Sequence, residues 1–369
     1  MDMTPDRAPG ERSRLLEAWA ALAREAEEPN CFYAPEMLRP ALQHLAGRNK
    51  VRLLEAWDGK RLIGLLPVTT SSQHGRFPVR NVTNWMHTHC FFGTPLILMG
   101  KGQQAWQQFL QGLDDVSWAP GFLHLAGMDE EGPNVQSLRA LCHQQGRGLR
   151  LIHCYERALL NSALSADAYW ETNMRGKKRK EIRRLQNRLH ELGAVSSSVL
   201  SHASDLDRWC DDFLELERAG WKGRARTALA CDPMETAFFR DSMAGAFAAQ
   251  SLMFLRLDLD GRPLAMLVNF VTGDGGFSFK IAFDETMARF SPGVLIEIEN
   301  LRQVLDHGPC QWMDSCAAAG HPMIDSLWAE RRRIVQFRVE LKGRGRGLAW
   351  QMMKAADQAA ALVKRGSNQ

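Results

Sequence analysis

The chain has 369 residues, of which 45% are hydrophobic and 24% are charged. These proportions are typical of a soluble globular protein, and they exclude a disordered chain, a collagen-like repeat and a small disulfide scaffold. The length exceeds what one hydrophobic core usually supports, so two domains are expected.

The net charge of +4 conceals two basic clusters. Residues 175–188 hold eight basic residues and one acid, and residues 330–346 hold seven basic residues and two acids. The rest of the chain carries a net charge of −8. Any function must therefore explain two cationic patches on an acidic body.

The eight cysteines are scattered, without the spacing of a zinc site or a redox pair. This pattern favours a reducing cytoplasm and predicts no metal site. The first residues are charged, and no apolar run is long enough to span a bilayer. The expected location is cytoplasmic, with room for peripheral contact at the inner membrane.

The first half of the chain predicts a mixed α/β order. Two strands flank Asp58-Gly59, a strong two-residue hairpin signal. Alternating and helical periodicities then predict, in order, an apolar stretch, a helix, a strand, a helix and a strand. These segments are Val51–Ala56, Arg61–Thr70, Val82–Phe92, Gln103–Leu113, Gly121–Ala126, Asn134–Gln145 and Leu149–Tyr155.

The second half predicts the same order, starting with a hairpin around Asp260-Gly261. Its segments are Leu252–Asp258, Pro263–Thr272, Phe277–Phe283, Gly293–Asp306, Cys310–Ser315, a short helix at Asp325–Arg331 and Arg333–Glu340. Residues 59–70 align without gaps to residues 261–272, an offset of 202 residues. A tandem duplication explains both observations, and chance similarity of two hairpins is the alternative.

A helical region over 165–192 joins the halves, and a helix over 349–363 closes the chain. Ile182, Leu185, Leu189 and Leu192 form an apolar stripe at helical spacing, so the basic residues between them face outward. CoA phosphates, an anionic membrane surface and tRNA are the three candidate ligands of this cationic face. The absence of interleaved aromatic residues makes nucleic acid the least favoured, unless it is tRNA. The second basic cluster, with Gly343–Gly347, predicts a flexible loop for anionic head groups or a linker.

Strand order and several local sequences resemble the GNAT acyltransferase superfamily, in particular its CelD/BcsL-type, FemAB-like branch with two GNAT folds in one chain. The sequences are GLLPV (64–68), GTPL (93–96), RRLQNRLHELG (183–193), FLELERAGWKG (213–223), FSPGVLIEIE (290–299) and MDSCAAAGHPMIDSLWAERR (313–332). The resemblance implies a degenerate GNAT-like domain over 1–160 and a GNAT domain over 161–369. It also implies acyl-CoA as cosubstrate and an amine as acceptor.

The usual GNAT pyrophosphate loop is missing, and its place in the second half is taken by residues 288–293. Ser291 is a good N-cap, Pro292 suits the first helical position and Gly293 lets a ligand approach. A helix N-terminus binds anions, and Arg289 adds charge. A cofactor-binding role for Arg289, Ser291 and Gly293 is therefore one interpretation, and a plainly capped helix is the other.

In GNAT folds the thioester lies where the fourth and fifth core strands diverge, which the resemblance maps to Phe277–Phe283 and Cys310–Ser315. Lys280 and Ser278 are expected on one face of the first strand, with Lys280 binding the cofactor. Asp314 and Trp312 are expected on one face of the second. Asp314 is interpreted either as a group that orients or deprotonates the amine, or as a cap of the strand end.

His321 follows in a loop and is the leading candidate for the base, because imidazole titrates near neutral pH. Glu217, Trp221 and Lys222 form a tight group that the resemblance places at the edge of the acceptor pocket. Lys222 is a candidate catalytic residue, and Glu217 and Trp221 are candidate substrate-binding residues. Ordinary packing is the alternative for Trp221.

The resulting hypothesis is an acyl-CoA-dependent N-acyltransferase that acts on a lipid or cell-envelope amine, such as a sphingoid base or an amino sugar. One alternative is a FemAB-like transferase that uses aminoacyl-tRNA on a peptidoglycan precursor. The other is a non-catalytic module that binds membrane surfaces.

Overall fold

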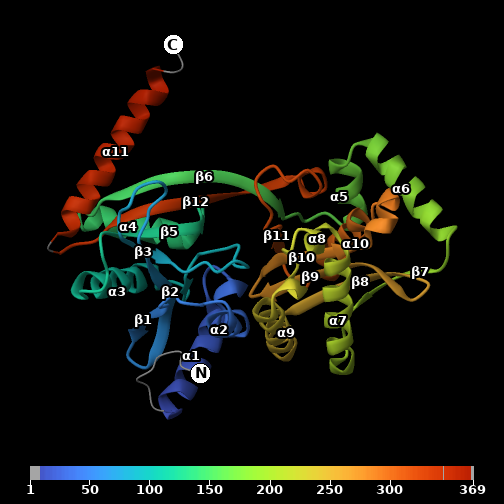
Figure 1. Ribbon diagram of the computed structural model, residues 1–369, viewed down its shortest axis with the longest axis horizontal. Helices are drawn as coiled ribbons and strands as arrows, with labels where there is room; N and C mark the ends of the chain where they lie inside the picture. The colour runs from blue at the N-terminus through green and yellow to red at the C-terminus, as the bar shows by residue number, and fades with distance from the viewer. Residues whose placement is uncertain (1–8, 344, 367–369) are drawn as a thin grey trace. The chain divides into compact units, whose positions relative to one another are not determined.

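The computed structural model describes residues 9–343 and 345–366 (Figure 1). The chain forms two compact units, and both are discontinuous in sequence. Among the described residues, unit 1 contains Pro29–Gly47 and Glu156–Arg332, and unit 2 contains the remainder.

Unit 2 is built on an antiparallel meander followed by a parallel crossover. Its elements are α1 (Pro9–Glu25), β1 (Arg52–Asp58), β2 (Arg61–Ser71), β3 (Asn81–Asn84), β4 (Leu96–Ile97), α3 (Gly102–Asp115), β5 (Phe122–Asp129), α4 (Pro133–Gln144), most of β12 (Glu330–Glu340) and α11 (Arg346–Gly366). β1, β2 and β3 pair antiparallel, whereas β3 pairs parallel with β5 after the α3 crossover. Gly59 makes the first hairpin turn with φ of 59°, as the Asp-Gly signal predicts.

Unit 1 repeats this arrangement. Its elements are η1 (Cys31–Tyr33), α2 (Pro35–His44), the end of β6 (Leu149–Leu160), α5 (Ala166–Asn173), α6 (Gly176–His190), β7 (Val195–Val199), α7 (Ala203–Ala219), α8 (Trp221–Arg224), η2 (Leu229–Cys231), α9 (Pro233–Ala248), β8 (Leu252–Leu259), β9 (Arg262–Thr272), β10 (Gly275–Phe283), η3 (Glu285–Phe290), α10 (Pro292–His307), β11 (Trp312–Asp314) and η4 (Ile324–Ser326). β7 to β10 pair antiparallel in succession, and β10 pairs parallel with β11 after the α10 crossover.

The repeated order supports the predicted duplication, and the structure adds an exchange of terminal strands. The end of β6 pairs with β11 of unit 1, whereas β12 pairs with β5 of unit 2. Each half of the sequence therefore supplies the last strand of the other half's sheet. The units for this reason do not divide at the expected boundary between residues 160 and 161.

Different helices pack on the two faces of the unit 1 sheet. α5, α6 and α10 bury apolar side chains such as Ile182 and Leu295 against Leu255 and Leu267 on one face. α7 and α9 cover the other face, where Phe213 stacks on Phe239 with 5.2 Å between ring centroids. The predicted helical region over 165–192 is two helices, because Met174 and Arg175 adopt extended backbone angles.

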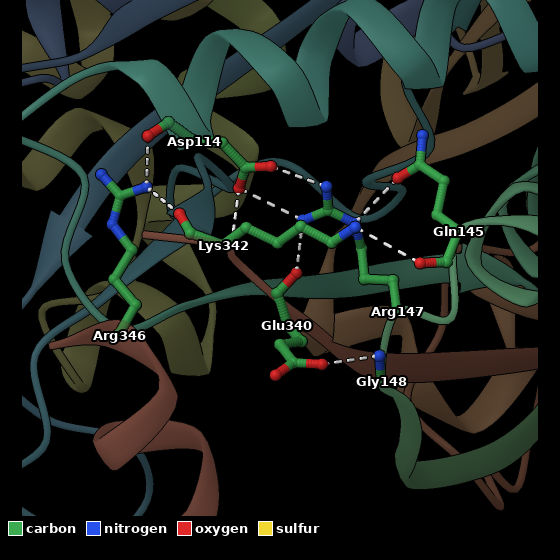
Figure 2. A network of polar contacts seen from close by, with 7 residues as sticks. All are labelled: Asp114, Gln145, Arg147, Gly148, Glu340, Lys342 and Arg346. Carbon is green, nitrogen blue, oxygen red and sulfur yellow. Dashed lines mark hydrogen bonds and ion pairs between the residues drawn. The ribbon is translucent and has the colours of Figure 1, made fainter. Parts of the chain in front are cut away.

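In unit 2 a polar network fixes the chain after β12 (Figure 2). Arg147 bonds Asp114 through two nitrogens and donates to the carbonyl of Glu340 at 2.7 Å. Arg346 donates to the carbonyls of Asp114 and Lys342 at 2.8 and 2.7 Å. These arginines lie at the C-terminal end of α3, where carbonyls lack partners within the helix.

The second basic cluster is consequently not a free cationic loop. Arg346 is buried in the network, Arg338 binds Asp357 at 3.0 Å, and Arg333 binds Glu130 at 2.9 Å. The cluster looked exposed in sequence because the partners of these side chains, acids for Arg333 and Arg338 and carbonyls for Arg346, come mostly from other elements. Arg344 lies outside the described residues.

Candidate functional site

The site is organised by the divergence of β10 and β11 in unit 1. The two strands pair over Gly275–Phe277 and Trp312–Asp314, and β10 then continues to Phe283 without β11. The strand order expected for this point is confirmed. A ligand that enters between the strands meets side chains of β10 beyond Phe277.

A β-bulge at Phe279 decides which of those side chains face which helices. Ser278 pairs with Asn269 of β9, and Lys280 pairs with the next residue, Val268. Neighbouring residues on a strand point to opposite faces, so Ser278 and Lys280 do not share a face as expected. Lys280 faces α7 and α9, away from α10, and its expected role in binding the cofactor stays a prediction.

Lys280 belongs to a group of four charged side chains that we call the lysine cluster: Glu217, Lys222, Glu235 and Lys280. Glu217 Oε1 binds Lys222 Nζ at 2.8 Å, and Lys222 also donates to the carbonyl of Ile281 at 3.5 Å. Glu217 is 3% exposed, and its second oxygen accepts the amide of Leu229 at 2.8 Å. Lys280 interacts electrostatically with the three other members.

The environment of Lys280 favours loss of its proton. Burial lowers the pKa of Lys280 to about 8, Glu217 and Glu235 partly counter this shift, and Lys222 adds to it. Burial likewise raises the pKa of Glu235, against the effect of Lys280. A lysine with this pKa can exchange a proton near neutral pH.

Trp221 lies at the mouth of the cluster and is 56% exposed, so it is not a core residue. It lines a shallow pocket with Leu216, Glu217, Lys222 and β10 residues. A larger open pocket of about 500 Å³ shares Leu216 and Glu285 with it. Glu217, Trp221 and Lys222 are therefore together, as expected.

Asp314 is fully buried between two arginines. Arg157 binds it through two nitrogens, each at 2.7 Å, and Arg332 binds it at 3.1 Å. Burial would raise the pKa of Asp314, but the two guanidinium groups lower it below its ordinary value. With both oxygens engaged, Asp314 anchors β11 and is not placed to take a proton from an amine.

The contacts that the structure gives for Trp312 and His321 involve no member of the lysine cluster. Trp312 packs against Phe277, at 5.5 Å between ring centroids, and under the guanidinium of Arg332 at 4.7 Å. His321 accepts the amide of Ile324 at 3.5 Å in the loop after β11. Within the described ranges, Asp314 contacts arginines and the amide of Cys316, and no hydrogen bond joins it to His321.

The loop at residues 288–293, the candidate site for the cofactor pyrophosphate, offers few hydrogen-bond donors. Ser291 caps α10 with φ of 53°, and its carbonyl accepts the amides of Val294 and Leu295 at 2.9 and 3.1 Å. Pro292 has no amide, which leaves that of Gly293 for a ligand. A Cβ on Gly293 would meet Phe283 at an ordinary 3.4 Å, so no cradle requires glycine there. Arg289 is exposed, over the ring of Phe290. The loop therefore fits a pyrophosphate poorly.

The first basic cluster does form a cationic face on α6. Ile182, Leu185 and Leu189 are buried as predicted, whereas Leu192 lies past the helix end and is 47% exposed. Arg184 is paired with Glu181 at 2.6 Å. The exposed basic residues for which the structure gives no acidic partner in the described chain are Arg175, Lys177, Lys180, Arg183 and Arg188.

Sequence reasoning missed Glu235, Arg157 and Arg332. Glu235 lies in the first turn of α9, where an acid is ordinary helix chemistry. Arg157 lies in β6, and nothing in its sequence context indicates that it pairs with a residue 157 positions away. The Arg-Arg-Arg run at 331–333 was the available signal for Arg332.

Comparisons with known proteins agree with this architecture. Residues 176–321 match the family model described as an acetyltransferase (GNAT) domain. A crystal structure of FemX superposes with a TM-score of 0.60 at 9% identity, covering 91% of this chain and 98% of that one. The C-terminal domain of a putative lysylphosphatidylglycerol synthetase from Agrobacterium fabrum gives 0.54 at 12% identity, covering 92% and 95%.

L-PGS from Bacillus licheniformis gives a TM-score of 0.51 at 11% identity, covering 89% of this chain and 97% of that one. Curated protein sequences yield no match. The fold is of the mixed α/β class, and the domain model that matches is that of a transferase. Residues 176–321 therefore match a GNAT domain, and the fold of the whole chain is similar to those of FemX and L-PGS.

Two further properties bear on ligands. Across residues 9–343 and 345–366, no three His, Cys, Asp or Glu side chains gather as a metal site would require. No helix in the same ranges is both long and apolar enough to cross a membrane.

Proposed function

We propose that unit 1 is an N-acyltransferase in which the lysine cluster receives the amine acceptor. The observation that carries this proposal is the position of Lys280, half-buried beyond the divergence of β10 and β11 among Glu217, Lys222 and Glu235. Glu217 and Lys222 bind each other and hold the loop to η2, so they shape the pocket. Of the expected catalytic residues, Lys222 thus shapes the pocket, whereas His321 and Asp314 are left out of the proposed chemistry.

The proposed reaction transfers one acyl group and one proton. Neutral Lys280 accepts a proton from the amine as the amine nitrogen attacks the acyl carbonyl. The bond between the carbonyl carbon and the leaving group breaks, and the leaving group takes the electron pair. The leaving group is then protonated, and Lys280 returns its proton to solvent.

Acyl-CoA is the first candidate donor, because GNAT domains generally bind it. Aminoacyl-tRNA is the second candidate, and two observations favour it. Among the described backbone amides from Ser291 to Leu295, that of Gly293 has no backbone partner and could meet a pyrophosphate, and α6 carries a face of exposed cations. Such a face suits a polyanion, whose binding weakens steeply with salt. The proposed acceptor is an amine on a lipid or envelope precursor, as the relatives' names suggest.

The test is a transfer assay with the purified full chain. One arm supplies acyl-CoAs from acetyl to stearoyl, and the other supplies total tRNA charged with radiolabelled amino acids. Sphinganine, glucosamine and phosphatidylethanolamine vesicles are the acceptors. Label that appears on an amine supports the proposal, and loss of transfer after RNase treatment identifies the RNA donor.

The proposal would be contradicted if the protein bound anionic vesicles through α6 and turned over neither donor. Replacing Lys177, Lys180 and Arg183 by Gln should weaken donor binding and reduce its salt dependence. A triple Gln variant of exposed cations in unit 2, Arg48, Lys50 and Lys60, is the matched control. If that control weakens donor binding equally, the α6 face is not the donor surface.

A further inference from the structure

The face of the unit 1 sheet that α10 covers contains a line of three polar side chains inside an apolar core. Glu297 and Asn300 lie on successive turns of α10, and Asn269 lies on β9 beneath them. Glu297 is 3% exposed, and both asparagines are completely buried. The proposed reaction uses none of them, and a buried carboxyl without a cation beside it is costly to ionise.

The hydrogen bonds in this line have a single direction. Asn300 Nδ2 donates to Glu297 Oε2 at 3.2 Å, and Asn300 Oδ1 accepts from Asn269 Nδ2 at 2.9 Å. An ionised carboxylate only accepts, so it fixes the orientation of the Asn300 amide, which in turn fixes that of Asn269. Asn269 Oδ1 is then left as a buried acceptor with no partner among the described residues.

Protonation of Glu297 would reverse this direction. A neutral carboxyl can donate its O–H to Asn300 Oδ1, and Asn300 Nδ2 can then donate to Asn269 Oδ1. In the reversed state Asn269 Oδ1 gains a partner, and Asn269 Nδ2 gives up Asn300 Oδ1 as its acceptor. The line therefore has two hydrogen-bonding states that differ by one proton on Glu297.

The two states differ in their contact with β11. In the observed state, Asn300 Nδ2 also approaches Met313 Sδ at 3.4 Å, a weak donor–acceptor contact. Met313 pairs with Gly276, and Asn269 pairs with Ser278, so both ends of the line meet strands at their divergence. After reversal, an amide oxygen would face the thioether, and the attraction would be lost.

We propose that Glu297, acting through Asn300, is a positioning residue whose charge state sets the junction of β10 and β11. This inference rests on the proposed function, since the junction is where the acyl donor would lie. Ionised Glu297 holds Met313 in the observed place, and protonated Glu297 releases it. The transfer reaction thereby acquires a second proton-dependent control, separate from Lys280.

The surroundings of Glu297 leave it as the group that titrates near neutral pH. Burial raises the pKa of Glu297 to about 7, and Asn300 moderates the shift. The titratable neighbours from packed elements are Tyr169 of α5 and Cys310 before β11, and burial raises the pKa of both. On α10 itself, Glu299 and Arg302 pair with each other at 2.5 Å.

Infrared spectroscopy tests the proton on Glu297 without any substrate. The wild-type chain should show a buried carboxylic acid band that disappears as the pH rises through about 7. The band should be missing in Glu297→Gln and present in Glu299→Gln, the matched control. A spectrum in which no such band titrates between about pH 5 and 9 would overturn the proposal.

Kinetics test the positioning role. Glu297→Gln imitates the protonated state, so its kcat at pH 8 should be about tenfold below wild type with the donor KM unchanged. Met313→Leu should keep the infrared band but removes the thioether contact. The rise of kcat with pH as Glu297 ionises should therefore be weaker in this variant than in wild type. Wild-type pH profiles in both variants would overturn the proposal. If no donor is turned over, the proposed function fails. The infrared experiment still shows whether Glu297 gains and loses a proton near neutral pH.

Discussion

Two buried carboxyl groups of unit 1 show how neighbours set the charge of a residue. Asp314 is completely buried, yet Arg157 and Arg332 keep its pKa below the ordinary value. Glu297 is as deeply buried, but its partner is the neutral amide of Asn300, and its pKa rises to about 7. Burial supplies the same penalty in both cases, and the partner decides which form of the acid survives.

The first prediction concerns Asp314. Asp314→Asn should destabilise the protein by about 3–5 kcal/mol, because two buried guanidinium groups would lose their counter-charge. Urea unfolding followed by circular dichroism measures this change. Asp274→Asn, an exposed position, should change stability by about 0.5 kcal/mol or less. Equal stabilities for the two variants would show that the ion triad is not formed.

The sequence predicted the members of the site better than their roles. Glu217, Trp221 and Lys222 are close in sequence, so their proximity follows from one helix end. The face of Lys280 was predicted wrongly, because a bulge at Phe279 leaves no signal in the alternation of residues. The role of Asp314 depends on Arg157, whose position opposite β11 requires the tertiary fold.

At the scale of elements, the hairpins and crossover helices follow from local signals. Asp-Gly turns and periodicity predicted β1–β2, β8–β9, α3 and α10 within a few residues. The exchange of β6 and β12 was not predicted, since strand periodicity contains no information about which sheet a strand joins. The same limit explains why the second basic cluster looked exposed.

The second prediction concerns the attachment of α11 in unit 2. Arg346→Gln, at the start of α11, removes donors to the carbonyls of Asp114 and Lys342 (Figure 2) and to the carbonyl of Val116. Hydrogen exchange in residues 346–353 should become faster, by about tenfold for a loss of about 1.4 kcal/mol of local stability. Lys354→Gln, at an exposed position, should leave exchange unchanged. Unaltered exchange in Arg346→Gln would contradict the role of this network.

At the scale of the whole molecule, the charge distribution is less polarised than the sequence suggested. The cations of the α6 face remain exposed in unit 1, whereas Arg333 and Arg338 of the second cluster form ion pairs inside unit 2 and Arg346 is bound by carbonyls. In the described part of the chain, the α6 face is therefore the surface we assign to an anionic ligand. Buried titratable groups also make the stability of the protein depend on pH.

The third prediction is that His74 makes the protein less stable as the pH falls below about 6.5. Burial lowers the pKa of His74 to about 4, from an ordinary 6.5, so the unfolded state binds more protons and stability falls as pH drops through this range. The raised pKa of Glu297 acts oppositely over nearly the same range, because its contribution is lost between its ordinary pKa of 4.5 and about 7, and it therefore partly offsets the effect of His74. Urea unfolding from about pH 4 to 9 measures the curve. His74→Gln should flatten its acid limb, and an unchanged limb would exclude His74 as its cause.

The most direct test of the account is the pH dependence of amine-acceptor transfer by wild type and Lys280→Arg. Wild-type transfer should rise with pH through about 8, as Lys280 loses its proton. Arginine keeps the charge but cannot deprotonate, so transfer should fall by about 100-fold or more and lose this rise, while donor binding persists. Lys60→Arg, at an exposed position in unit 2, should match wild type. A Lys280→Arg variant with the wild-type rate and profile would contradict the central claim.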